Sequence, residues 1–166
     1  MNQRLAIIAT HPIQYYAPLF KHLTERGINC KVFYTWGEGG MKNKFDPSFG
    51  KTISWDIPLL DGYTYEFCEN IAKQPGSHHY KGIVTPKLIS SIQQYGATHI
   101  LIFGWNFKSH LQVMRFFKGK IPVLFRGDST LLNDSKEFSA KKIARKIALT
   151  WVYKYIDIAF YVGQAN

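Results

Sequence analysis

Polar and aromatic residues that can bind or activate a substrate directly follow four apolar segments of the sequence. These groups are Thr10-His11-Pro12-Ile13-Gln14-Tyr15-Tyr16, Gly104-Trp105-Asn106, Arg126-Gly127-Asp128-Ser129 and Gly163-Gln164. A histidine can orient or deprotonate a hydroxyl group. A guanidinium group binds phosphate or carboxylate through two parallel hydrogen bonds, and amide and phenol groups hydrogen-bond sugar hydroxyls. The four groups therefore suit a polar or phosphorylated substrate.

Each of these groups also has an ordinary structural interpretation. His11 is either an active-site group or a loop imidazole bonded to the backbone. Arg126 either faces a phosphate or fixes its own turn through Asp128 or a carbonyl group. Trp105 is either a platform for a sugar ring or a packing residue. On the functional interpretation, the catalytic candidates are His11 and Arg126. The substrate-binding candidates are Gln14, Tyr15, Gly104, Trp105, Asn106, Gly127, Asp128, Ser129 and Gly163.

Alternating strand and helix patterns must position these groups. Strands are predicted at Leu5–Ala9, Cys30–Tyr34, His99–Phe103, Val123–Arg126 and Ile158–Val162. Helices are predicted from Pro18 to Arg26, from an N-cap at Thr85 to Gly96, over Ser109–Phe117 and over Ala140–Tyr155. This alternation indicates an α/β fold with a Rossmann-like, doubly wound, mainly parallel sheet and helices on both faces. Ligands bind such sheets at the carboxyl ends of the strands, so the four groups are expected to meet at one edge.

A long segment from Trp36 to Gly62 interrupts this pattern. It is rich in Gly, Lys, Asp and Pro, and Ser54–Ile57 is its one candidate strand. Irregular segments of this length inside a domain are usually functional or mobile. Its Lys42, Lys44 and Lys51 suit either a phosphorylated lipid carrier or a solvated loop.

Several common kinds of site are absent from the sequence. No glycine-rich dinucleotide motif follows Ala9, and there is no P-loop, GxSxG or Asp-x-Asp motif. The adjacent pair His78-His79 lacks the spacing of a helical metal site. The two cysteines, Cys30 and Cys68, have no metal-binding spacing and no disulfide framework. We therefore expect neither a metal nor a resident cofactor.

Length and composition fit one globular domain. The chain has 166 residues, of which 46% are hydrophobic, and a formal charge of +10. Such a charge suits nucleic acid, an anionic membrane or a phosphorylated substrate. No nucleic-acid-binding motif is present, so nucleic acid is not expected as a partner. A signal peptide and a membrane-spanning run are both missing from the sequence, and this predicts a cytoplasmic location.

The predicted helix over Ala140–Tyr155 is amphipathic. Its apolar stripe consists of Ile143, Ala144, Ile147, Ala148, Trp151, Val152 and Tyr155. The opposite side carries Lys141, Lys142, Arg145 and Lys146. The stripe is expected to pack on the sheet, which leaves a basic face that is either simply solvated or in peripheral contact with anionic lipids. Each basic residue near such a membrane contributes on the order of 1 kcal/mol.

Three segments together resemble the N-terminal domain of family 4 glycosyltransferases. They are Ala9-Thr-His-Pro-Ile-Gln-Tyr-Tyr-Ala-Pro-Leu-Phe-Lys-His-Leu23, Ile102-Phe-Gly-Trp-Asn106 and Val123-Leu-Phe-Arg-Gly-Asp-Ser-Thr130. They occur in the expected order, and the resemblance spans essentially the whole chain. Members of this family are GT-B enzymes, in which two Rossmann-like domains face each other across a cleft.

The resemblance implies a retaining, metal-independent hexosyltransferase that moves a sugar from a nucleotide-sugar donor to a glycan or lipid-linked acceptor, in cell-surface polysaccharide synthesis. The chain matches the acceptor-side domain. The donor-binding C-terminal domain is missing from the sequence, so the chain alone is expected to be inactive. Many relatives carry a glycine pair where this chain has His11-Pro12, which weakens the case for backbone contact with the donor phosphate. The alternative function is a non-catalytic module that binds a sugar or a nucleotide.

Overall fold

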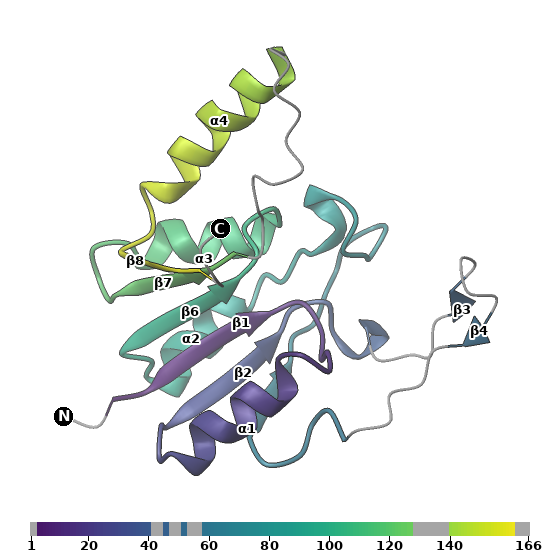
Figure 1. Cartoon of the computed structure of the whole chain (residues 1–166), viewed down its shortest axis with the longest axis vertical. Helices are drawn as coiled ribbons and strands as arrows, with labels where there is room; N and C mark the ends of the chain where they lie inside the picture. The colour runs from purple at the N-terminus through teal and green to yellow at the C-terminus, as the bar shows by residue number, and fades with distance from the viewer. Residues whose placement is uncertain (1–2, 41–44, 47–50, 53–57, 128–139, 162–166) are drawn as a thin grey trace.

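The computed structural model describes residues 3–40, 45–46, 51–52, 58–127 and 140–161 (Figure 1). The main sheet has six strands, all parallel: β1 Leu5–Ala9, β2 Cys30–Tyr34, β5 Thr64–Phe67, β6 His99–Phe103, β7 Val123–Arg126 and β8 Ile158–Phe160. A separate antiparallel pair is formed by β3 Phe45–Asp46 and β4 Lys51–Thr52. The helices are α1 Ala17–Glu25, α2 Leu88–Tyr95, α3 Lys108–Phe117 and α4 Ala140–Tyr153, with short 3₁₀ turns η1 Glu38–Gly40 and η2 Tyr80–Gly82.

The strand order of the main sheet is β5-β2-β1-β6-β7-β8. From β1 the chain winds outward to β2 and β5, crosses back to the other side of β1, and continues through β6, β7 and β8. This is the doubly wound Rossmann-like arrangement that the sequence predicts. Its direction of winding reverses between β1 and β6, and ligands of such folds bind in the crevice at that reversal.

The core lies on both faces of the sheet. On one face, alternate residues such as Ile8 and Ile102 pack with α2 and α3, for example against Ile92 and Met114. The other face packs on α1, chiefly through its Phe20. The central strands β1 and β6 are buried on both sides, which explains their continuous apolar sequences.

Most predicted elements are confirmed, with one correction at the start of α2. Pro18 lies in the first turn of α1, and Gly96 ends α2 with a positive φ of 70°. The predicted N-cap at Thr85 is wrong, because α2 begins only at Leu88. Thr85 is buried, its N–H donates to Ser109 Oγ at 2.7 Å, and its hydroxyl has no hydrogen-bond partner within the described residues.

Two further differences concern the sheet's edges. Strand β5, which was not predicted, joins the sheet beside β2 through the pairs from Lys31↔Thr64 to Tyr34↔Phe67. The candidate strand Ser54–Ile57 lies outside the described residues. Strand β8 ends at Phe160, earlier than predicted.

Helix α4 differs most from expectation. It ends at Tyr153 and extends away from the sheet instead of lying on it (Figure 1). Val152, near its C-terminal end, is buried in the core. Ile143, Ile147 and Trp151 are exposed, with Ile147 at 65%. The expectation that the apolar stripe packs on the sheet is therefore wrong for these three residues. No helix in the described part of the chain has the length and apolar character of a membrane span.

Replacing Ile102 by alanine tests the central position of β6. Ile102 is fully buried between β1 and β7, so its truncation should lower the free energy of unfolding by about 2–5 kcal/mol. Urea denaturation followed by circular dichroism measures the change. Ile71→Ala is the matched control, since Ile71 is 56% exposed and should shift the unfolding free energy by less than about 0.5 kcal/mol. Equal losses in the two variants would contradict the assigned core.

Candidate functional site

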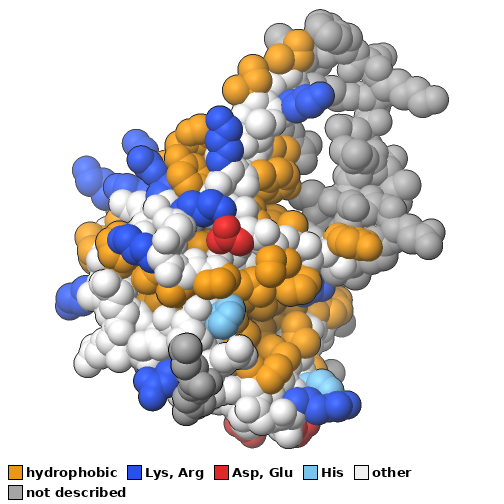
Figure 2. Space-filling view, turned by 90° about the vertical axis from the view of Figure 1, so that its left-hand side faces the viewer, with side chains coloured by type: hydrophobic (Ala, Val, Ile, Leu, Met, Phe, Trp, Pro, Cys, Tyr) orange, Lys and Arg blue, Asp and Glu red, His pale blue; other side chains and the backbone are white. Residues whose placement is uncertain are grey.

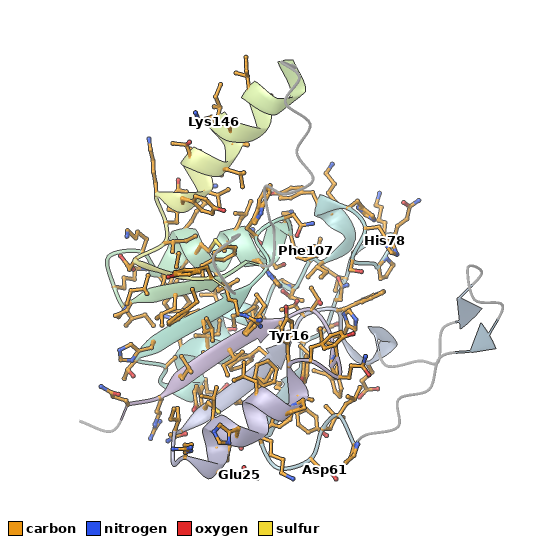
Figure 3. The ribbon with its side chains drawn as sticks, in the orientation of Figure 1. Tyr16, Glu25, Asp61, His78, Phe107 and Lys146 are labelled. Carbon is orange, nitrogen blue, oxygen red and sulfur yellow. The ribbon has the colours of Figure 1, made fainter. Side chains whose placement is uncertain are left out.

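A cavity of about 790 Å³ lies at the carboxyl edge of the sheet. Its walls come from the loop after β1, the loop after β6, the end of β7 and the segment from Tyr153 to Tyr161. It includes the ends of β1 and β6, between which the sheet's winding reverses. The volume is in the range of pockets that hold small molecules. Of the residues labelled in Figure 3, Tyr16 and Phe107 line this cavity.

Most of the predicted site residues in the described segments meet at this cavity. Its lining includes His11, Gly104, Trp105, Asn106, Arg126 and Gly127. Gln14 and Tyr15 are not among the lining residues, and Tyr15 is 77% exposed. Tyr16 lines the cavity instead. The remaining candidates Asp128, Ser129 and Gly163 lie outside the described residues.

Arg126 is held against aromatic rings. Its guanidinium carbon lies 4.9 Å from the centre of the Tyr16 ring and 5.4 Å from that of Phe103. The two rings themselves pack with centroids 4.5 Å apart. A guanidinium group on aromatic faces keeps its charge and loses little rotational freedom on binding a ligand. The end of β7 thus presents a fixed cation to the cavity.

His11 is oriented by two neighbours. Its Nδ1 lies 2.9 Å from Thr10 Oγ1, within hydrogen-bond distance. Its ring meets the ring of Trp36 edge-on, with centroids 5.2 Å apart and an angle of 88°. Trp36 follows β2 and is nearly buried, so the loop after β1 is packed against the end of the neighbouring strand. An imidazole held in this way can position a substrate hydroxyl without first losing much rotamer entropy.

A buried hydrogen-bond network connects the strand ends at the carboxyl edge of the sheet, next to the cavity. His110 of α3 is fully buried, and its Nδ1 lies 3.0 Å from the carbonyl oxygen of Gly104. Its Nε2 lies 2.8 Å from the hydroxyl of Thr35, which is also 3.1 Å from the carbonyl oxygen of Ala9. Burial lowers the pKa of His110 to about 4, so the ring is neutral at pH 7. The neutral ring then donates from Nδ1 to the carbonyl oxygen of Gly104. The single proton of the Thr35 hydroxyl is shared between two acceptors, Nε2 of His110 and the carbonyl oxygen of Ala9.

The loop after β6 depends on Gly104. Its φ of 80° lies in the left-handed region, which a residue with a side chain rarely adopts. This conformation, together with the bond to His110, sets the course of the backbone into Trp105 and Asn106. Gly104 therefore shapes the wall of the cavity through its backbone.

Sequence reasoning missed the wall formed by the C-terminal segment. Tyr153, Asp157, Phe160 and Tyr161 line the cavity, although none of them was a candidate. Asp157 has a structural role there: its carboxylate accepts from Lys118 Nζ and from the Val123 N–H. Both donors hold the pKa of Asp157 below its usual range, chiefly through Lys118. The signal available in the sequence was the pair of aromatic residues, Phe160 and Tyr161, in the predicted strand Ile158–Val162.

The cavity's chemistry is that of an organic, polar ligand. Among the described residues, no group of three or more His, Cys, Asp or Glu is placed to hold a metal ion. The cavity combines one fixed cation, an imidazole, an amide and several aromatic faces. Such a set can bind a phosphate group together with a sugar or a base. Comparison with models of known protein families, and with curated proteins, gives no match.

The burial of His110 predicts a pH-dependent stability. Its folded-state pKa of about 4 is below the ordinary 6.5, so between these pH values the unfolded chain binds a proton that the folded chain does not. The free energy of unfolding should therefore fall as pH decreases from 6.5 towards 4, by at most about 1.4 kcal/mol per pH unit from this group. Urea titrations over this range measure the slope.

The variant His110→Gln should be less stable at neutral pH and have a flatter profile in the same window. His22→Gln is the control, because His22 is exposed on α1, and its profile should follow that of the unmodified protein. Identical slopes with and without His110 would show that its protonation is not linked to folding.

Proposed function

We propose that this chain is the acceptor-side domain of a retaining, metal-independent glycosyltransferase of the GT-B type. The substrates would be a nucleotide-sugar donor and a glycan or lipid-linked acceptor, as in the synthesis of cell-surface polysaccharides. One observation carries the proposal: His11, Arg126 and the Gly104–Asn106 loop, which are far apart in the sequence, line a single cavity at the reversal point of the sheet. A donor-binding domain across the cleft would complete the site.

Arg126 would act on the leaving group. When the bond between sugar and nucleotide breaks, negative charge develops on the departing phosphate oxygen. A guanidinium group already fixed on Tyr16 and Phe103 can stabilise that charge without reorganising. The same cation would bind the phosphate of the ground state less strongly, because the charge there is smaller and more dispersed. This difference is what accelerates the reaction.

His11 and the aromatic wall would act on the acceptor. The imidazole lines the same cavity as the C-terminal aromatic residues and can hydrogen-bond an attacking hydroxyl. Trp105 lines the cavity and would pack against a sugar ring. Holding the hydroxyl on the face of the sugar from which the nucleotide departs, as retention requires, would supply much of the rate enhancement by positioning alone.

Substitution of Arg126 tests the role of its charge. With the whole gene product, we expect Arg126→Met to lower kcat/KM for nucleotide release by about a hundredfold, since it removes one transition-state cation. Arg126→Lys should lower kcat/KM by a smaller factor, because lysine keeps the positive charge. The assay presents UDP-, GDP- and dTDP-sugars with a membrane lipid extract as acceptor. Methionine keeps apolar bulk against Tyr16 and Phe103, which limits the loss of packing.

Arg26→Ala is the matched control, because Arg26 is exposed after α1 at the opposite, amino edge of the sheet. It should retain full activity. Release from no donor by folded protein with a competent extract would contradict the transferase. If a nucleotide or sugar still bound in an Arg126-dependent manner, the result would support a non-catalytic binding module instead.

Replacement of His11 tests the second role. His11→Phe keeps an aromatic ring against Trp36 but removes both nitrogens, so kcat should fall by at least about tenfold with little change in stability. The turnover rate and a thermal unfolding curve are measured on the same preparation. An unchanged kcat would show that His11 has a structural role and not the proposed one in catalysis.

A further inference from the structure

The exposed side of α4 is unusually apolar for a surface helix. Ile143, Ile147 and Trp151 are spaced four residues apart, so they form one stripe along the helix. Their side chains are 44%, 65% and 42% exposed. Figure 2 shows hydrophobic side chains, with Lys and Arg side chains among them, on the part of α4 that projects from the body of the molecule. Neighbouring apolar side chains that are exposed together on one side of a helix can mark an interaction surface.

Basic residues surround this stripe. In residues 108–127 and 140–161 the sequence has ten Lys or Arg and a single acidic residue, Asp157, which is paired with Lys118. Lys146 and Lys154 are exposed beside the stripe, and the guanidinium carbon of Arg115 lies 5.7 Å from the Trp151 ring. Figure 3 shows Lys146 on the projecting part of α4, away from the sheet. The stripe and these cations form what we term the α4 surface: Ile143, Ile147, Trp151, Arg115, Lys146 and Lys154.

Charge decides among the partners that an apolar stripe can have. A second copy of this chain would bring two strongly basic surfaces together, which repel. Nucleic acid would satisfy the cations, but the isoleucines offer nothing that a phosphate or a base edge can bind. A bilayer with anionic headgroups satisfies both parts at once, because cations meet the headgroups while apolar side chains enter the acyl boundary.

We propose that the α4 surface binds anionic membranes, with Ile143, Ile147 and Trp151 inserted below the headgroups. The cations Arg115, Lys146 and Lys154 lie at headgroup level. This differs from contact by charge alone, because binding then needs both an apolar and an electrostatic component. Tyr153, the last residue of α4 and two residues after Trp151, lines the cavity, so the cavity would open near the lipid surface.

Vesicle flotation tests the two components separately. The protein should float with vesicles of phosphatidylcholine and phosphatidylglycerol, and much less with phosphatidylcholine alone. Ile147→Asp should weaken binding to the mixed vesicles at least about tenfold, because it removes an inserted side chain and adds a buried charge. Ile71→Asp makes the same exchange at an exposed site in another loop and should bind nearly as the unmodified protein does.

Lys146→Glu and Lys73→Glu form the second matched pair, since each changes the net charge by the same amount at an exposed lysine. Only Lys146→Glu should weaken binding strongly, and the difference should shrink in high salt. Circular dichroism confirms that each variant is folded. Equal binding to both kinds of vesicle, or unchanged binding by Ile147→Asp, would overturn the proposal. So would an absence of vesicle binding with a dimer that Ile147→Asp dissociates, which would assign the stripe to a second copy.

Discussion

The hydrogen bonds around His110 hold together the edge on which the candidate site is built. One imidazole on α3 connects the residue after β2, Thr35, with the residue after β6, Gly104, and Thr35 in turn reaches the end of β1. All of these groups are buried or nearly so, and an unpaired polar group there would cost about 1–3 kcal/mol. The carboxyl ends of β1, β2 and β6 are thereby fixed relative to one another before any ligand binds.

Parallel packing then determines where the polar residues go. Because the sheet reverses its winding between β1 and β6, the loops after these strands turn to opposite faces and leave a crevice between them. His11 enters it from one side and Asn106 from the other, while Arg126 comes from the next strand. Aromatic contacts then orient the side chains. Tyr16 and Phe103 pack against the guanidinium group of Arg126, and Trp36 packs against the imidazole of His11.

The sequence predicts the central part of this structure because burial on both faces leaves an unambiguous signal. β1 and β6 are continuous apolar runs, and their ends carry the site residues. β5 escapes prediction because Thr64–Phe67 is an edge strand with exposed and half-buried side chains, so no apolar run marks it. Tyr15 and Tyr16 adjoin in a turn, and their sequence does not reveal that only Tyr16 contacts Phe103. Periodicity identifies the apolar side of α4 but not whether anything covers it.

The position of α4 follows from how little of it the core can use. Only its last turn reaches the sheet. There Val152 is buried, and the ring centroids of Tyr153 and Phe125 lie 6.0 Å apart. The preceding turns combine isoleucines at a regular spacing with four basic residues, on a segment that extends beyond the core. Ile143, Ile147 and Trp151 are only partly buried, and exposed apolar surface of this kind raises the risk of aggregation. A partner that covered them would remove this apolar surface from water, and the lysines beside them favour one that is negatively charged.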